Sequence, residues 1–225
     1  MAMFNLVSIL ENNVRERPDK AAVVFGQFRL SYAQINMMAN QLANGLRSIG
    51  IGRGDKVAFS CPNLPYFPIV WFGVLKTGAT LVPMSVLLTR REIAYHLTDS
   101  ESRAYICFEG TAELPMGEAG RAAFAEVESC EHFYVIPTQP GGSSPYEGVK
   151  TLMELMGAQS PECETDQCSP DDTALIIYTS GTTGQPKGAE LTHSNLLTNC
   201  MVSTQLFETR ENDVSMAVLP LFHSF

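Results

Sequence analysis

The chain has 225 residues, of which 45% are hydrophobic, and it carries a formal net charge of −9. The hydrophobic content is enough for one sizeable core. The acidic balance argues against a nucleic-acid or anionic-membrane partner, because such partners require clustered Lys and Arg. The longest apolar run, residues 66–75, contains a proline and is far shorter than the roughly 20 residues of a membrane span. No secretory leader is recognisable, so we expect a cytoplasmic protein with no integral membrane segment and with reduced cysteines.

Helical and strand patterns alternate between residues 31 and 136. Ser31 and Gln34 form a capping box, after which apolar residues recur at helical spacing until Gly50 ends the helix. Thr89 and Glu92 form a second capping box at the start of another helix. Further helices are expected at residues 64–77 and 118–128, and short apolar strands at residues 55–60, 79–82, 104–108 and 132–136. This alternation predicts an α/β fold, with a doubly wound and mostly parallel sheet flanked by helices.

Two segments rich in Pro, Gly, Ser or acidic residues, 137–148 and 158–172, are expected to be exposed connections. A strand at residues 173–178 begins directly after the second of them. We therefore predict a first α/β subdomain over residues 1–170 and the start of a second α/β lobe over residues 171–225.

The predicted second lobe continues with a short strand at residues 188–191, a helix and a strand at residues 214–219. Thr192 is expected to be the N-cap of the helix. The helix would carry a stripe formed by Leu196, Leu197, Cys200, Met201 and Thr204.

Residues 178–188 read Tyr-Thr-Ser-Gly-Thr-Thr-Gly-Gln-Pro-Lys-Gly. Glycine lets a backbone approach a ligand closely, hydroxyls donate hydrogen bonds, and lysine supplies a positive charge. An ordinary Gly/Thr-rich hairpin turn would explain the glycines and threonines, but not a lysine held among three glycines. We interpret the segment as a polyphosphate-binding loop. Its candidate binding residues are Thr179, Ser180, Gly181, Thr182, Thr183, Gly184 and Lys187.

The loop differs from a Walker A loop, which requires G-x-x-x-x-G-K-[ST]. Gln185 and Pro186 separate Gly184 from Lys187, and Gly188 stands where a Walker loop has Ser or Thr. A kinase or GTPase of the P-loop type is therefore disfavoured.

The same residues resemble the phosphate-binding loop of adenylate-forming enzymes, a superfamily of acyl-CoA synthetases, luciferases and nonribosomal-peptide adenylation domains. Weaker elements of that superfamily surround the loop in the expected order. Residues 30–34 resemble its L-[ST]-Y-x-[EQ] element, residues 75–83 its L-K-x-G-A-x-x-V-P element, and residues 220–223 its P-[LM]-F-H element. Residues 90–100 and the Phe222-His223 pair are similar to fatty acyl-CoA synthetases.

The resemblance implies ATP-dependent activation of a carboxylic acid to an acyl-adenylate, followed by thioester formation with coenzyme A. Ser180, Thr182, Thr183 and the loop amides would hold the leaving phosphates, while Lys187 and Mg²⁺ would neutralise their charge. A fatty acid is the expected substrate, and it would suit peripheral association with a membrane. An aryl acid as substrate, or a carrier protein as acceptor, remains an alternative.

The resemblance also implies that His223 is a catalytic residue near the acyl carboxylate. A lone histidine beside phenylalanines is otherwise most often a core residue. His193 is expected in the first turn of its helix, with a structural role. No H-x-x-x-H or C-x-x-C array is present, so we expect no zinc site and assign no metal ligands.

The sequence stops within an apolar element, and the resemblance implies that family members continue well beyond this point. We therefore expect this chain to be the N-terminal part of a larger enzyme, with weak or absent adenylation activity on its own. A naturally short, non-catalytic nucleotide-binding module is the alternative of a different class. Nothing in the sequence specifies an oligomeric state.

Overall fold

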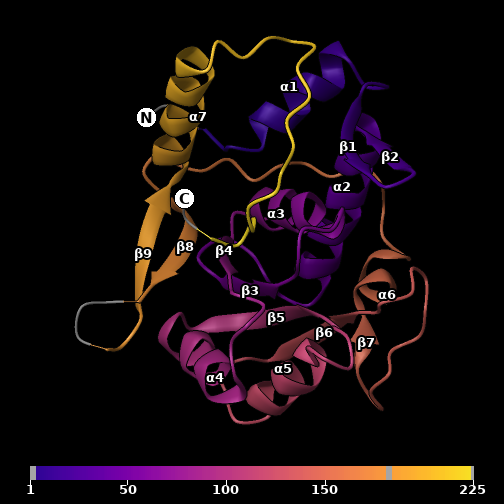
Figure 1. Cartoon of the computed structure of the whole chain (residues 1–225), viewed down its shortest axis with the longest axis vertical. Helices are drawn as coiled ribbons and strands as arrows, with labels where there is room; N and C mark the ends of the chain where they lie inside the picture. The colour runs from indigo at the N-terminus through magenta and orange to yellow at the C-terminus, as the bar shows by residue number, and fades with distance from the viewer. Residues whose placement is uncertain (1–3, 181–183, 224–225) are drawn as a thin grey trace.

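A largely parallel sheet of seven strands organises the computed structural model, which describes residues 4–180 and 184–223 (Figure 1). This sheet contains β3 (Lys56–Ser60), β4 (Thr80–Pro83), β5 (Ser102–Phe108), β6 (His132–Ile136), β7 (Lys150–Thr151), β8 (Thr173–Thr179) and β9 (Lys187–Thr192). Two further strands precede them in the chain, β1 (Ala21–Phe25) and β2 (Phe28–Ser31). The large sheet has the order β7-β6-β5-β3-β4-β8-β9, and β1 and β2 form a separate hairpin. Neighbouring strands of the large sheet are parallel, except that β9 is antiparallel to β8.

Helices cover both faces of this sheet. They are α1 (Ser8–Glu16), α2 (Tyr32–Ser48), α3 (Tyr66–Lys76), α4 (Arg90–Asp99), α5 (Met116–Phe124), α6 (Leu152–Met156) and α7 (His193–Leu206). From β3 the chain passes through α3 to β4, and then returns through α4 to β5 on the other side of β3. Because crossovers between parallel strands are right-handed, these opposite directions put α3 and α4 on opposite faces. The predicted doubly wound α/β fold is confirmed.

Each face of the sheet has its own hydrophobic core. Ile106 packs with residues of α2 and α3 such as Leu42 and Val70, whereas the neighbouring Tyr105 packs with Leu97 of α4. Successive side chains of a strand point to opposite faces, so a strand covered on both faces is apolar at nearly every position. This is why the buried strands could be recognised as short apolar runs in the sequence.

The predicted capping boxes begin their helices. The Gln34 N–H donates to Ser31 Oγ over 3.3 Å, and the Ser31 N–H donates to Gln34 Oε1 over 2.8 Å. Thr89 and Glu92 form the equivalent box at the start of α4. Gly50, with a φ of +82°, follows the end of α2, so the predicted stop is also confirmed.

The predicted strand at residues 214–219 is wrong, because these residues form no strand and pair with no strand among the described residues. Instead the Asn63 side chain binds the segment. Its Nδ2 donates to the carbonyls of Ala217 and Leu219, and its Oδ1 accepts the N–H of Leu221. The apolar pattern that suggested a strand is exposed here, with Val214 accessible to 90%.

The helix that Thr192 was expected to cap is present as α7, and Thr192 Oγ1 accepts the Asn195 N–H over 3.1 Å. The predicted apolar stripe is only partly buried, however. Leu196 and Leu197 pack against the core, whereas Cys200 and the other stripe residues further along are exposed. The cap depends on local sequence alone, but burial depends on the neighbouring elements.

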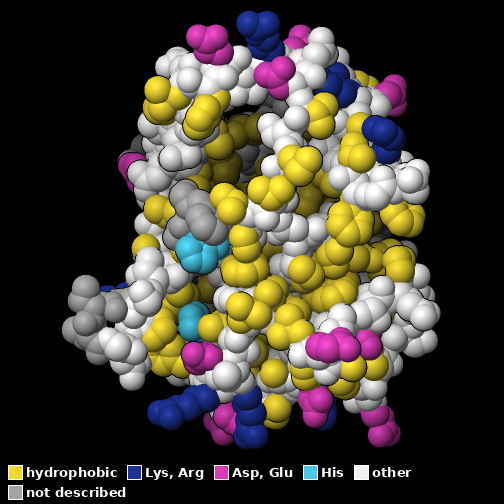
Figure 2. All heavy atoms as spheres, in the orientation of Figure 1, with side chains coloured by type: hydrophobic (Ala, Val, Ile, Leu, Met, Phe, Trp, Pro, Cys, Tyr) yellow, Lys and Arg dark blue, Asp and Glu magenta, His cyan; other side chains and the backbone are white. Residues whose placement is uncertain are grey.

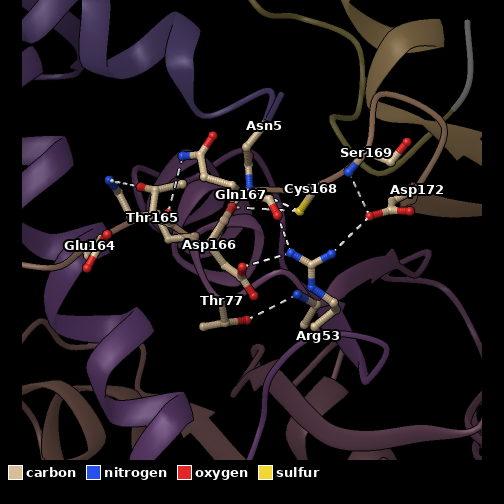
Figure 3. Close-up of polar contacts among 12 residues, drawn as sticks. Asn5, Arg53, Thr77, Glu164, Thr165, Asp166, Gln167, Cys168, Ser169 and Asp172 are labelled. Atoms are coloured by element: carbon tan, nitrogen blue, oxygen red, sulfur yellow. Dashed lines mark hydrogen bonds and ion pairs between the residues drawn. The ribbon is translucent and has the colours of Figure 1, made fainter. Parts of the chain in front are cut away.

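The connection at residues 158–172 is held more firmly than the sequence suggested. Arg53 lies between Asp166 and Asp172 at N···O distances of 2.9 and 3.5 Å, and it also donates to the carbonyl of Gln167 (Figure 3). The Asn5 side chain donates to the carbonyl of Asp166 over 2.9 Å. These contacts fix the start of β8, which leads to the predicted phosphate-binding loop.

Lys76 lies within residues 75–83, the element that ends in β4. Its side chain is 1% exposed, and its ammonium lies 2.7 Å from Glu11 Oε1 and 3.2 Å from Thr165 Oγ1. Burial alone would raise the pKa of Glu11, but the hydrogen bonds from Lys76 and Thr165 lower it below its usual value. Lys76 therefore joins α1, α3 and the connection to β8, and its role in this chain is structural.

Three parts of the fold were not predicted: α1, the β1–β2 hairpin, and the short β7 with α6. Thr151 and Glu154 form a capping box at α6, so its signal was present in the sequence. β8 pairs with β4 in the main sheet, so both predicted subdomains contribute to one sheet, while the boundary at residue 170 stays a prediction. None of the helices among the described residues is long and apolar enough to cross a membrane.

Candidate functional site

The glycine-rich segment forms the connection of the β8–β9 hairpin. The last strand pair is Thr179 with Lys187, and Tyr178 lies opposite Gly188. Residues 180–186 make the connection, of which Gly181, Thr182 and Thr183 lie outside the described residues. The hairpin leaves the sheet at the carboxyl end of β8, and open α/β sheets bind ligands at the carboxyl ends of their parallel strands.

Packing requires a glycine at position 188. A Cβ added at this position would lie 2.8 Å from Ile176 Cγ2 and 3.3 Å from Tyr178 Cζ. These distances are shorter than normal van der Waals contacts, so a larger residue would displace the Tyr178 ring or the strand itself. At Gly188, the residue after Lys187, β9 therefore packs closely against the Tyr178 ring of β8.

The described polar residues of the loop are accessible. Thr179, Ser180, Gly184 and Lys187 are all exposed, and Gly184 has a φ of +87°, which favours glycine. Residues paired directly across a ladder share one face of the sheet, so Thr179 and Lys187 project from the face opposite to that of Tyr178. Thr179 and Lys187 thus supply a hydroxyl and an ammonium group from the same face at the base of the loop.

Helix α4 contacts both ends of the loop. The Tyr95 hydroxyl donates to the carbonyl of Pro186 over 2.8 Å, and the Tyr178 hydroxyl donates to Asp99 Oδ2 over 2.7 Å. The imidazole of His96 lies 4.1 Å from the Tyr178 ring, centroid to centroid. Burial, followed by the hydrogen bond to Asp99, raises the pKa of Tyr178, and burial lowers the pKa of His96. Tyr178 therefore stays a neutral donor.

Sequence reasoning missed these α4 residues as part of the site. The spacing of Tyr95 and Asp99 places them on one face of a predicted helix. Nothing in the sequence indicated that this face would meet the loop, because that depends on which strand lies beside β4. The parallel pairing of Leu81 with Leu175 supplies this information.

His223 lies on the segment that Asn63 binds. Asn63 follows the carboxyl end of β3, so the segment crosses the same edge of the parallel sheet from which β8 enters the loop. The side chain of His223 is exposed, and the backbone N–H of His223 donates to the carbonyl of Pro220 over 3.1 Å. The role of His223 at the acyl carboxylate stays a prediction.

His193 has the structural role expected of it. It is buried at the start of α7, and its Nδ1 accepts the N–H of Leu6 over 3.2 Å. Burial lowers the pKa of the imidazole. The neutral ring joins the N-terminal segment to the β8–β9–α7 unit.

The residues at the loop fit a polyphosphate. Exposed hydroxyls at Thr179 and Ser180, a glycine at positive φ and the Lys187 ammonium supply donors and positive charge at one place. Because the chain as a whole is acidic, with a net charge of −9, attraction of phosphate has to come from these local groups.

The fold and the loop together define an α/β protein with its candidate ligand site at the carboxyl edge of a parallel sheet. The model of the AMP-binding enzyme family matches residues 10–225, and the chain belongs to this family.

Relatives of known name support this assignment. A crotonobetaine/carnitine–CoA ligase of Salmonella arizonae is 37% identical over 216 residues, covering 91% of this chain and 40% of that protein. The long-chain-fatty-acid–CoA ligase FadD13 of Mycobacterium tuberculosis is 32% identical over 195 residues, covering 87% of this chain and 36% of that protein. The chain thus spans well under half the length of these relatives.

Solved structures have the same fold. The inhibitor-bound N-terminal domain of FACL13 from Mycobacterium tuberculosis superimposes with a TM-score of 0.83 at 30% identity, covering 97% of this chain and 52% of that one. ATP-bound MatB from Rhodopseudomonas palustris gives a TM-score of 0.82 at 27% identity, covering 97% and 41%.

Proposed function

We propose that this chain provides the phosphate-binding part of an AMP-forming acid–thiol ligase. Such an enzyme activates a carboxylic acid with ATP to an acyl-adenylate and then forms a thioester with coenzyme A. The observation that carries the proposal is the group of exposed residues Thr179, Ser180, Gly184 and Lys187 at the carboxyl end of β8, in a chain of the AMP-binding enzyme family. Relatives that are named CoA ligases support the second half of the reaction.

Each loop residue has a proposed role. Thr179, Ser180 and Gly184 would hold the phosphates, together with the resemblance-based candidates Gly181, Thr182 and Thr183. Lys187 would stabilise the negative charge that grows on the leaving pyrophosphate. Mg²⁺, when bound with ATP, supplies further positive charge at the phosphates. His223 would orient the acyl carboxylate.

A fatty acid is the proposed substrate. The similarity to FadD13 supports it, and hydrophobic side chains gather over the centre of the face that carries the C-terminal segment (Figure 2). Other relatives are named for different acids: the Salmonella protein for crotonobetaine and carnitine, and AuaEII for anthranilate.

Exchange of labelled pyrophosphate into ATP tests the proposal. We would use the complete product of the native reading frame with a long-chain fatty acid, a short betaine-type acid and an aryl acid, and a reaction without acid as the control. We expect exchange that depends on the acid and is greatest with the fatty acid. A folded protein that binds Mg-ATP but exchanges with none of the acids would contradict the proposal and favour a non-catalytic binding module.

A further inference from the structure

The two ends of the phosphate-binding loop are attached to the same helix. The Tyr95 hydroxyl donates to the carbonyl of Pro186, the residue directly before Lys187. Asp99 accepts the hydroxyl of Tyr178, the residue directly before Thr179. Tyr95 lies 3.4 Å from Asp99 Oδ1, but its single hydroxyl hydrogen favours the shorter bond of 2.8 Å to Pro186.

The helix that makes these contacts is itself firmly placed. α4 begins with the Thr89–Glu92 capping box, and Ile93 and Leu97 are buried in the core between α4 and the sheet. Tyr95 and Asp99 are four residues apart and so share the face that meets the hairpin. The helix therefore anchors both ends of the loop to the core.

The attachment matters because a loop that binds through many weak contacts must be ordered to bind. Tyr95 fixes the carbonyl of Pro186, and the next residue carries the ammonium group proposed to meet the phosphates. We propose that Tyr95 and Asp99 are positioning residues, which hold Lys187 and Thr179 in the arrangement that binds the β- and γ-phosphates of ATP. This inference rests on the proposed function of the loop.

Substitutions at Tyr95 and Asp99 test the attachment. Tyr95→Phe removes only the hydroxyl, and Asp99→Ala removes the acceptor of Tyr178, whereas Asp99→Asn keeps an acceptor oxygen in place. Tyr134→Phe is the matched control, because it removes a hydroxyl from β6, which β5, β3 and β4 separate from β8. Hydrogen–deuterium exchange of peptides covering residues 178–190 is measured without nucleotide, and urea unfolding reports global stability.

We expect exchange in these peptides to be about threefold or more faster in Tyr95→Phe and Asp99→Ala, with the rest of the chain unchanged. Asp99→Asn should recover most of the wild-type rate, and Tyr134→Phe should match wild type. Loop exchange equal to wild type in both Tyr95→Phe and Asp99→Ala would overturn the inference, as would an increase spread evenly over the whole chain.

Binding of Mg-ATP and of AMP to the complete product of the native reading frame gives the functional readout. Losing one hydrogen bond should raise the Kd for Mg-ATP about 3- to 10-fold in Tyr95→Phe. The Kd for AMP should not change, because AMP has no β- or γ-phosphate. Equal Mg-ATP affinity in wild type and variant would overturn the inference alone. A wild-type protein that binds no Mg-ATP would contradict the proposed function as well.

Discussion

At the scale of single residues, the loop combines positions that are constrained for different reasons. Gly188 is small because Ile176 and Tyr178 pack over it, and Gly184 is a glycine because its φ is positive. Lys187 is the loop residue whose contribution is a charge. A substitution at Lys187 therefore tests phosphate binding with little disturbance of the fold.

Lys187→Ala should weaken binding of Mg-ATP by about 1–3 kcal/mol, the range for a charge-assisted hydrogen bond. Lys187 is exposed, so the free energy of unfolding should change little. Calorimetric titration of both proteins measures the difference. Lys150→Ala is a suitable control, since it removes the same charge from β7 at the opposite edge of the sheet. Equal affinities in Lys187→Ala and wild type would remove Lys187 from this role.

The titration of His193 should make the stability of the protein depend on pH. Its pKa in the folded protein is lowered, first by burial, although Asp172 acts in the opposite direction. The contribution of His193 to the free energy of unfolding is then fully present above pH 6.5, the usual pKa of histidine. It is lost as the pH falls below this value, because the unfolded chain takes up the proton more readily. Protonation of Nδ1 would also set a donor against the N–H of Leu6.

His193→Asn should make stability less sensitive to pH below 6.5, because the amide oxygen can accept the Leu6 N–H without titrating. Part of the dependence should remain, since the buried His96 also has a lowered pKa. Urea unfolding of both proteins at a series of pH values measures the effect. Parallel pH profiles would show that His193 does not contribute.

At the scale of elements, the sequence predicted the features that depend on nearby residues, namely where helices begin and which strands are buried. The capping boxes predicted at Ser31 and Thr89 and the N-cap predicted at Thr192 begin helices in the structure, and the buried strands were apolar enough to be recognised. The strand predicted at residues 214–219 failed because a strand also needs a neighbour, and here the Asn63 side chain takes the backbone groups instead. Tyr95 and Asp99 were missed for the same reason, since their role comes from a non-local contact.

Thr192 connects β9 to α7 and provides a test at this scale. Thr192→Ala removes the acceptor for the Asn195 N–H and should destabilise the protein by about 1 kcal/mol. Thr192→Ser keeps the hydroxyl and should retain most of the stability. The free energies of unfolding in urea decide between these expectations. A loss in the serine variant as large as in the alanine variant would show that the methyl group, rather than the cap, is responsible.

At the scale of the whole molecule, the candidate site depends on the order of the strands. β8 lies beside β4, and this places the loop against α4, while Asn63 after β3 fixes the C-terminal segment at the same edge of the sheet. The alternation of helical and strand patterns predicted the α/β class, but the strand order that unites these parts depends on contacts between distant residues. The loop motif was specific enough to predict the family without that order.

In the proposed reaction a carboxylate attacks the α-phosphorus of ATP, and oxygen labelling tests this step most directly. The complete product of the native reading frame is supplied with ATP, coenzyme A and a fatty acid whose carboxylate carries ¹⁸O, and the products are analysed by mass spectrometry. In an acyl-adenylate, a carboxylate oxygen bridges carbon and phosphorus, and it stays with AMP when the thiol attacks the carbonyl carbon. We therefore predict one ¹⁸O atom in the AMP. Label in orthophosphate, with unlabelled nucleotide, would indicate an acyl-phosphate route and would contradict an acyl-adenylate intermediate.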